Sequence, residues 1–325
     1  MPIEPATQSS IQSAARILAR GGVVAFPTET VYGLGAVATN AKAVLRVYEM
    51  KGRPRFNPLI AHVADIECAR SHGEFNAEAH KLAEAFWPGP LTMVLKKRSE
   101  SRICDLVSAG LETIALRIPA NETARSLLRA AGCPLAAPSA NRAGHVSPTT
   151  AAHVAADLGE GPDIILDGGD AALGLESTVV DLSGSEPLLL RPGGLPREEI
   201  EKALGMPLGE TVHSAQPASP GQLASHYAPR AALRLDATSL APGESLLAFG
   251  PNPLGAENSM VNLSPKGDIR EAATRLFAAL RELDAGGCET IAVMSIPGDG
   301  LGEAINDRLR RAAAPRNENG SGLNQ

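Results

Sequence analysis

Residues 21–54 read GGVVAFPTETVYGLGAVATNAKAVLRVYEMKGRP, and this stretch indicates an α/β fold. Val23–Phe26 is a short apolar run after two glycines, which is typical of a buried strand. Asn40 is a favourable N-cap, and the apolar residues after it recur at helical spacing until Gly52. We therefore predict a strand, a loop over PTETVYGLG (27–35), and a helix that begins after Asn40.

Further strands and helices alternate irregularly on both sides of this stretch. Upstream, Ser9 or Ser10 is predicted to cap a helix that ends at Gly21-Gly22. Downstream, apolar runs predict strands at Leu91–Leu95, Ile114–Ile118, Ile164–Leu166, Ser177–Leu182 and Leu188–Leu190. Helical spacing predicts helices at about 77–86, 122–131, 149–158 and 197–204. This order predicts an open twisted mixed sheet with packed helices.

The composition changes after this region and then returns to regular patterns. Residues 206–230 are rich in Pro, Ser, Gln, Gly and Ala, as in a linker. A strand, a helix, a strand and a helix follow at Leu246–Phe249, Ile269–Leu283, Thr290–Met294 and Glu303–Ala313. We predict a first domain over 1–205, a linker over 206–230, a smaller Rossmann-like βαβα domain over 231–315, and a disordered tail over 316–325.

Composition excludes several classes of protein. The chain has 325 residues, 44% of them hydrophobic, and a net charge of -6, so bulk electrostatics will not draw it to nucleic acid. Aromatic residues make up only 3%, too few for a base-stacking platform. The cysteines (Cys68, Cys104, Cys133 and Cys288) lack the spacing of a zinc site. No signal peptide or membrane span is evident, and we predict a cytoplasmic protein.

Polar clusters at predicted strand ends and in loops form the candidate site. They are PTETVYGLG (27–35), KGRPRFNPLIAH (51–62), TIALRIP (113–119), APSANRAGHVSPT (137–149) and ESTVVD (176–181) with RPGG (191–194). Alternation puts Arg117 on the same strand face as Ala115, and a buried arginine is rare without an anion to pair with it. Lys51 could instead lie at the solvated end of a helix. Together the cations and hydroxyls predict a pocket for an anionic small molecule such as a nucleotide.

In order and spacing, these clusters resemble the YrdC/Sua5 family of L-threonylcarbamoyladenylate synthases. SHYAP (225–229) and GLGEAINDRLRRAA (301–314) resemble the two-domain Sua5 branch. The resemblance implies that threonine and bicarbonate form a carbamate, which attacks the α-phosphate of ATP and releases pyrophosphate. The product would supply the threonylcarbamoyl group that separate partner proteins place on a tRNA adenosine; direct tRNA contact stays open.

Site residues follow from the resemblance by motif matching. The family signature falls on four candidate catalytic residues, Lys51, Arg53, Ser139 and Asn141. The implied ATP-binding residues are Arg53, Asn57, Thr113, Ser139, Ser147, Arg191, His226 and Tyr227. The implied threonine-binding residues are Thr30, His62, Arg117, the backbone at Ala137, and Ser177. Arg117 is suited to clamp the carboxylate of threonine in a two-pronged contact.

The cofactor and the linker are predicted with less detail. Magnesium would accompany ATP and be held mainly by phosphates and water, since no dedicated set of acidic ligands is evident. Asp167 and Asp170 could hold a metal ion, but a tight turn explains them equally well. The linker is either a spacer or, with SHYAP, a lid that excludes water from the reactive carbamate and anhydride.

Two other functions remain in competition. Basic loops on a concave surface could bind double-stranded RNA, although the net charge of -6 and the scarcity of aromatic residues oppose this. A carbamoyltransferase-type domain, as in hydrogenase maturation proteins, would share the fold. Such domains lie in much longer chains with zinc motifs, which this sequence lacks.

Overall fold

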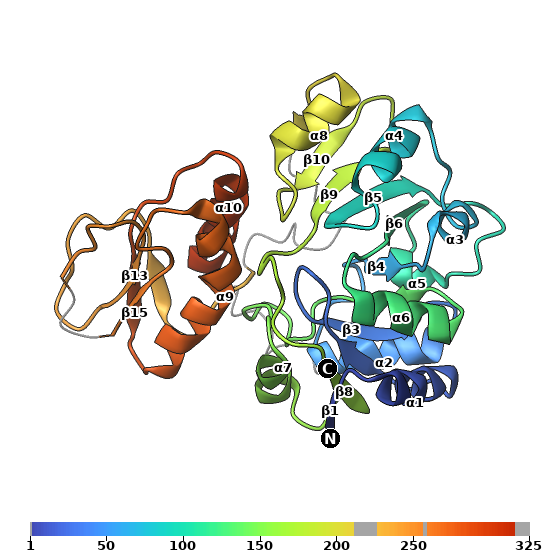
Figure 1. Cartoon of the computed structure of the whole chain (residues 1–325), viewed down its shortest axis with the longest axis horizontal. Helices are drawn as coiled ribbons and strands as arrows, with labels where there is room; N and C mark the ends of the chain where they lie inside the picture. The colour runs from blue at the N-terminus through green and yellow to red at the C-terminus, as the bar shows by residue number, and fades with distance from the viewer. Residues whose placement is uncertain (1, 211–225, 256–258, 316–325) are drawn as a thin grey trace, which may run out of the picture.

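The computed structural model describes residues 2–210, 226–255 and 259–315. Within these ranges the strands form one eleven-stranded sheet and one four-stranded sheet, which lie in separate parts of the molecule (Figure 1). No helix in these ranges has the length and apolar character needed to cross a membrane. The α/β class and the open mixed sheet are confirmed.

The large sheet has the strand order β1-β8-β2-β3-β7-β4-β6-β5-β9-β10-β11 and mixes parallel with antiparallel pairs. Its strands are β1 (Ile3–Pro5), β2 (Val24–Phe26), β3 (Gly33–Val37), β4 (Ile60–His62), β5 (Leu91–Lys96), β6 (Thr113–Arg117), β7 (Leu135–Ala136), β8 (Ile164–Asp167), β9 (Thr178–Asp181), β10 (Leu188–Arg191) and β11 (Gly209–Glu210). β11 adds to the sheet beyond residue 205, where the sequence places the end of the first domain.

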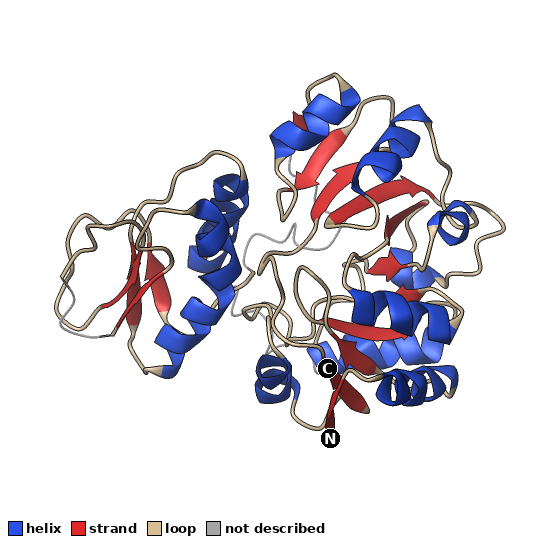
Figure 2. Cartoon of the chain, viewed as in Figure 1, coloured by secondary structure: helices blue, strands red, loops and turns tan. Residues whose placement is uncertain are grey.

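Helices pack on this sheet (Figure 2). They are α1 (Gln8–Ala19), α2 (Ala41–Lys51), α3 (Ile66–Arg70), α4 (Ala77–Phe86), α5 (Asp105–Ser108), α6 (Glu122–Ala131), α7 (Ala151–Leu158) and α8 (Arg197–Leu204). The N-cap of α1 is Thr7, whereas Ser10 lies inside the helix and completes a capping box with it, so the expectation of Ser9 or Ser10 as the cap is wrong. Asn40 caps α2 as predicted, by accepting hydrogen bonds from the backbone N–H groups of Lys42 and Ala43.

The predicted loop 27–35 is partly a strand. β3 begins at Gly33 and pairs with β2 on one side and with β7 on the other. Its glycines gave no strand signal, yet one of them is required: a Cβ on Gly35 would lie 2.6 Å from the ring of Phe26. The polar part of the motif, Thr28 to Thr30, remains a loop at the edge where β2 turns back into β3.

The small sheet is parallel and has the order β12-β15-β13-β14, with strands β12 (Ala232–Arg234), β13 (Ser245–Ala248), β14 (Met260–Asn262) and β15 (Thr290–Val293). Its helices α9 (Ile269–Ala285) and α10 (Leu301–Ala313) lie between this sheet and the large-sheet part (Figure 1). The apolar core around them also includes Val31, Val146 and Leu175 from the large-sheet part. The two parts therefore share one hydrophobic core.

A close backbone contact at Gly174 fixes this arrangement. Gly174 has φ +68°, and a Cβ there would lie 2.4 Å from the carbonyl oxygen of Thr274 in α9. The hydroxyl of Thr274 donates a hydrogen bond to the carbonyl of Ala172 at 3.2 Å. Only a glycine permits both the backbone conformation and the close approach of α9.

We expect Gly174→Ala to lower the free energy of unfolding by about 1–3 kcal/mol, because the methyl group strains the backbone and pushes against α9. Urea denaturation measures this change. Gly184→Ala is the matched control, since a Cβ at Gly184 meets no atom within 4 Å. Equal stability of the two variants would contradict the role of this contact.

Candidate active site

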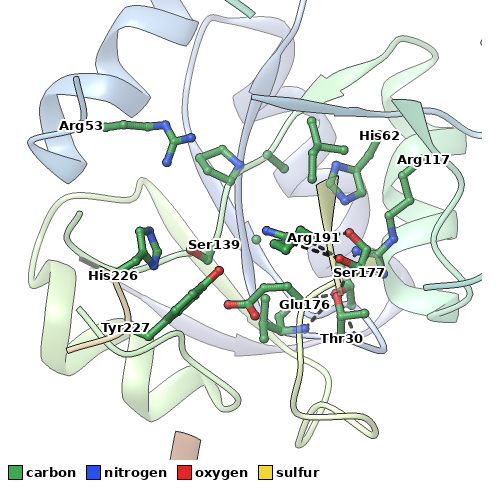
Figure 3. Close-up of a pocket in the computed structure, with 16 residues that line it drawn as sticks. Thr30, Arg53, His62, Arg117, Ser139, Glu176, Ser177, Arg191, His226 and Tyr227 are labelled. Carbon is green, nitrogen blue, oxygen red and sulfur yellow. Dashed lines mark hydrogen bonds between the residues drawn. The ribbon is translucent and has the colours of Figure 1, made fainter. Parts of the chain in front are cut away.

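A cavity lies where the central strands of the large sheet meet the described end of the linker. Its lining residues are Thr28, Thr30, Val31, Gly33, Arg53, Ile60, His62, Arg117, Ala137, Pro138, Ser139, Glu176, Ser177, Arg191, His226 and Tyr227. Ten of the predicted site residues are among them, and Figure 3 shows several pointing into one space.

Strand alternation explains how the floor of the cavity forms. In the parallel pair β4 and β6, His62 lies opposite Arg117. Ala61 and Leu116 point to the other face, where they join the core covered by helices. The predicted placement of Arg117 on the face of Ala115 is consistent with this pairing, because Ala115 packs with Ile60 on the cavity side.

A bulge in β10 brings Arg191 to the same face. The register of the β9–β10 pair shifts between Leu189 and Arg191. Leu190 and Arg191 therefore both face the cavity side, whereas strict alternation would point Arg191 to the opposite face. The guanidinium of Arg191 donates to the carbonyl of Ser177 at 2.7 Å and to its hydroxyl at 3.2 Å. The Ser177 hydroxyl is also 2.7 Å from that of Thr92.

Arg117 has an anionic partner within the protein. Its Nη2 donates to Glu29 at 2.7 Å, its Nη1 to the Thr30 hydroxyl at 3.0 Å, and its Nε to the Gly89 carbonyl at 3.2 Å. Burial alone would raise the pKa of Glu29, but Arg117 holds it below its ordinary value. The anion expected beside a buried Arg117 is thus, at least in part, a carboxylate of the protein itself.

Lys51 is buried behind the cavity and does not line it. Its Nζ donates to the carbonyls of Ser139 at 2.6 Å and of Asn141 at 2.5 Å. Burial, followed by the charge of Arg53, lowers the pKa of the ammonium well below its ordinary value. The alternative of a solvated helix end is wrong, because Lys51 is only 3% exposed. Its position fixes the loop that carries Ser139.

Arg53 lines the cavity and is oriented from behind. Its Nη2 donates to the Asn57 side-chain carbonyl at 2.7 Å and to the Pro58 carbonyl at 2.8 Å. Asn57 thus contacts Arg53 and is not among the lining residues. Burial lowers the pKa of Arg53 to about 10, which still leaves the side chain charged near neutral pH.

Besides Asn57, which contacts Arg53, four predicted residues are not among the lining residues of the cavity. Ser147 donates to Glu176 at 2.5 Å from behind the wall. Asn141 donates to the carbonyls of Arg142 and His145 and so shapes its own loop. Thr113 lies at the other end of β6 from Arg117. Lys51 is the fourth. None of these side chains lines the cavity, so each would act on a ligand through a neighbouring residue or would contact a part of the ligand that extends beyond the cavity.

The sequence did not assign Glu176, which lies in the wall of the cavity. Its carboxylate accepts from Ser147 and, at 2.8 Å, from Arg308 of α10. Burial would raise the pKa of Glu176, but Arg308 and Arg191 hold it below its ordinary value. The sequence signal for Glu176 was its place in ESTVVD next to Ser177. Its partner Arg308, however, is 132 positions further along the chain, where no local pattern indicates the contact.

Several buried polar atoms at the site have no hydrogen-bond partner among the described residues. They are Nδ1 of His62, Oδ1 of Asn141, Nδ1 of His226 and the hydroxyl of Tyr227. Burial lowers the pKa of His62 to about 3 and that of His226 well below its ordinary value, so both rings are neutral. Such atoms are costly to bury unless a ligand or water satisfies them.

His226 and Tyr227 are the first described residues of the second half of the linker. Residues 211–225 of the linker and the predicted tail 316–325 lie outside the described ranges. Figure 3 shows His226 and Tyr227 at the end of the cavity near Arg53, opposite His62 and Arg117. Tyr227 stacks on Phe277 of α9, with ring centroids 5.7 Å apart. The predicted lid segment is thus described only where it enters the cavity.

The described residues contain no group of three or more His, Cys, Asp or Glu side chains that could hold a metal ion. Asp167 accepts a hydrogen bond from the N–H of Gly169 at 3.0 Å, as in a tight turn. All four cysteines are free thiols.

Comparisons with known proteins agree with this geometry. A family model described as "Telomere recombination", of Sua5, YciO and YrdC proteins, matches residues 16–193, and one described as "Threonylcarbamoyl-AMP synthase, C-terminal domain" matches residues 195–314. Threonylcarbamoyl-AMP synthases of Pyrococcus abyssi and Bacillus subtilis are 41% and 40% identical to this chain, over 94% of it and 94% and 93% of their own lengths. The crystal structure of P. abyssi Sua5 complexed with L-threonine superposes with a TM-score of 0.88, at 38% identity over 96% of each chain.

We expect Glu29→Gln to be less stable than the wild-type protein at neutral pH, because it loses the buried ion pair with Arg117. The folded-state pKa of Glu29 is lowered, so this stabilisation is present above the unfolded value of about 4.5 and is lost as the pH falls through the folded value. Urea denaturation of both proteins between pH 7 and pH 3 measures the difference. A difference that does not shrink at acid pH would contradict the ion pair.

Proposed function

Because this chain belongs to the two-domain Sua5 family of threonylcarbamoyl-AMP synthases, which serve the threonylcarbamoyl modification of tRNA, we propose how its cavity performs the synthesis. The enzyme is a nucleotidyltransferase: it joins a threonine carbamate to AMP. The observation that carries the residue assignment is the division of the cavity, with Arg117 and His62 at one end and Arg53 and His226 at the other (Figure 3).

The first end is proposed to bind threonine. Three of the five N–H groups of Arg117 donate to described residues, and the other two suit the substrate carboxylate. The hydroxyls of Thr30 and Ser177, the Nδ1 of His62 and the backbone at Ala137 supply the remaining polar contacts. The relative crystallised with L-threonine supports a threonine site in this fold.

The second end is proposed to bind ATP. Arg53 and Arg191 would neutralise phosphate charge, while His226 and Tyr227 would cover the nucleotide. Asn57 would act by orienting Arg53, and Ser147 by holding Glu176. Ser139 would contact the nucleotide directly, whereas Thr113 would be reached only by a part of it that extends beyond the cavity.

The chemistry needs charge stabilisation more than proton transfer by side chains. The amine of threonine and bicarbonate form a carbamate and water. A carbamate oxygen then attacks the α-phosphorus, the bond from that phosphorus to the bridging oxygen breaks, and pyrophosphate leaves. Arg53 and Arg191 would stabilise the charge that develops on the phosphate oxygens. Lys51 and Asn141 would act by holding the Ser139 loop in place.

Magnesium is proposed to arrive with ATP. Glu176 is the carboxylate among the described lining residues, and Arg308 and Ser147 already occupy it. This donor set does not fit a resident magnesium ion, which prefers several oxygen ligands and water. We therefore assign the metal to the phosphates of the substrate and no reaction step to it.

The wider setting is also proposed. The domain division at 1–205, 206–230, 231–315 and 316–325 is proposed as well, and the two separate sheets among the described residues support a division into two main parts. The product would pass to separate tRNA-modifying proteins in the cytoplasm, and the four free thiols suit that reducing compartment. The synthase activity replaces the two alternatives raised by the sequence, an RNA-binding module and a carbamoyltransferase.

Pyrophosphate release tests the activity. The purified chain should release pyrophosphate from ATP and Mg²⁺ only when threonine and bicarbonate are both present. A coupled phosphate assay with each substrate omitted in turn measures this. Release that is independent of both substrates, or absent under every condition, would refute the proposed reaction.

Arg117→Met tests the threonine end. We expect the KM for threonine to rise about 30-fold or more, because the variant removes a buried charged partner of the carboxylate, while the KM for ATP changes little. Steady-state kinetics with each substrate varied measures the split. Arg98→Met, which removes an exposed arginine, is the control and should behave as wild type. An equal effect on both substrates would argue against this assignment.

A further inference from the structure

Arg308 is a fully buried charge whose contacts all lie in or near the active site, although it belongs to α10 of the small-sheet part. The side chain is 0% exposed. Its Nε donates to Glu176 at 2.8 Å, its Nη2 to the Pro192 carbonyl at 2.9 Å, and its Nη1 to Asp307 at 2.5 Å. A charge buried this completely requires partners on every side, and the partners here come from both parts of the chain.

Three segments of the cavity wall meet at this guanidinium. Glu176 lines the cavity, Pro192 follows the lining residue Arg191, and the ring of Tyr227 lies 4.8 Å from the guanidinium carbon. Figure 3 shows Glu176 and Arg191 in the middle of the site, with Tyr227 beside Glu176 toward the end that holds His226. The backbone N–H of His226 donates to the carbonyl of Arg311, one turn further along α10. α10 therefore holds the nucleotide end of the wall together.

The charge of Arg308 also matters to the site. Glu176 is ionised, because Arg308 and Arg191 outweigh the effect of burial on its pKa. A carboxylate in the wall of a cavity repels a polyphosphate, and the repulsion is reduced where a cation is paired with the carboxylate. Arg308 approaches Glu176 from the side away from the cavity, so it neutralises the carboxylate without being a lining residue.

We propose that Arg308 is a positioning residue of the nucleotide site, through which the C-terminal domain neutralises Glu176 and orders Tyr227 and the Arg191 loop for ATP. Arg308 touches no reacting atom in this role. The inference rests on the ATP end assigned above, and it gives the second domain a part in the synthesis itself.

Arg308→Met, Glu176→Gln and the double variant test this role by steady-state pyrophosphate release. With Arg308→Met, the KM for ATP should rise about 30-fold or more, because the carboxylate is left unpaired, while the KM for threonine changes much less. The defect should shrink as the pH falls, since an unpaired buried Glu176 takes up a proton and becomes neutral. A merely structural role would produce neither the split nor this pH dependence.

The double variant should recover most of the affinity for ATP, because a neutral glutamine needs no cation beside it. If the single Arg308→Met variant does not fold, the double variant is still expected to fold, because it contains no unpaired buried carboxylate at position 176. The KM for ATP can then be measured on the double variant. Glu176→Gln alone should raise the KM for ATP less than Arg308→Met does, because it removes the carboxylate charge that Arg308 balances. An ATP defect of about 30-fold that persists in the double variant would overturn the proposal.

Glu303→Gln is the matched control, since it lies on the same helix and breaks the ion pair with Arg197 between the two parts of the chain. It should leave both KM values unchanged, and an ATP defect equal to that of Arg308→Met would overturn the proposal. If the wild-type enzyme shows no pyrophosphate release that depends on threonine and bicarbonate, the proposed reaction itself is refuted. The two failures are thus distinguishable.

Discussion

The site depends on how the protein bears the cost of burying several cations in one small volume. Lys51, Arg117, Arg191 and Arg308 are each at most 3% exposed, and an isolated buried charge costs several kcal/mol. Glu29 and Glu176 each pair with one of them, while Lys51 donates to main-chain carbonyls. Among the described lining residues, Arg53, Arg117 and Arg191 outnumber the single carboxylate of Glu176, so the cavity wall carries positive charge inside an acidic protein. In the proposed function, a bound polyphosphate would supply the remaining negative charge.

The large sheet makes this arrangement possible by giving its two faces different tasks. In β4 and β6, alternate residues enter a helix-covered apolar core, and the residues between them face the cavity. The bulge in β10 adds Arg191 to the polar face without disturbing the apolar one. A rigid core on one face thus holds charged groups in fixed positions on the other, as an electrostatically preorganised site requires.

The sequence predicted regular elements better than the contacts between them. Long periodic segments such as α4 and α6 have the predicted bounds, but the three-residue strand β4 and the glycine-rich β3 carry too weak a pattern to be recognised. Motifs identified ten residues of the cavity lining. They could not show that Arg117 pairs with Glu29, 88 positions away, or that Lys51 faces carbonyls, because the tertiary fold decides which groups meet.

The shared core has a practical consequence for anyone who cuts the chain. Val31, Val146 and Leu175 belong to the large-sheet part, yet they pack in the cluster built around α9 and α10. In a fragment that ends at the linker, these apolar side chains would be exposed to water as a hydrophobic patch, which favours self-association. The boundary that looks simplest in the sequence is therefore a poor place to truncate this protein for expression in soluble form.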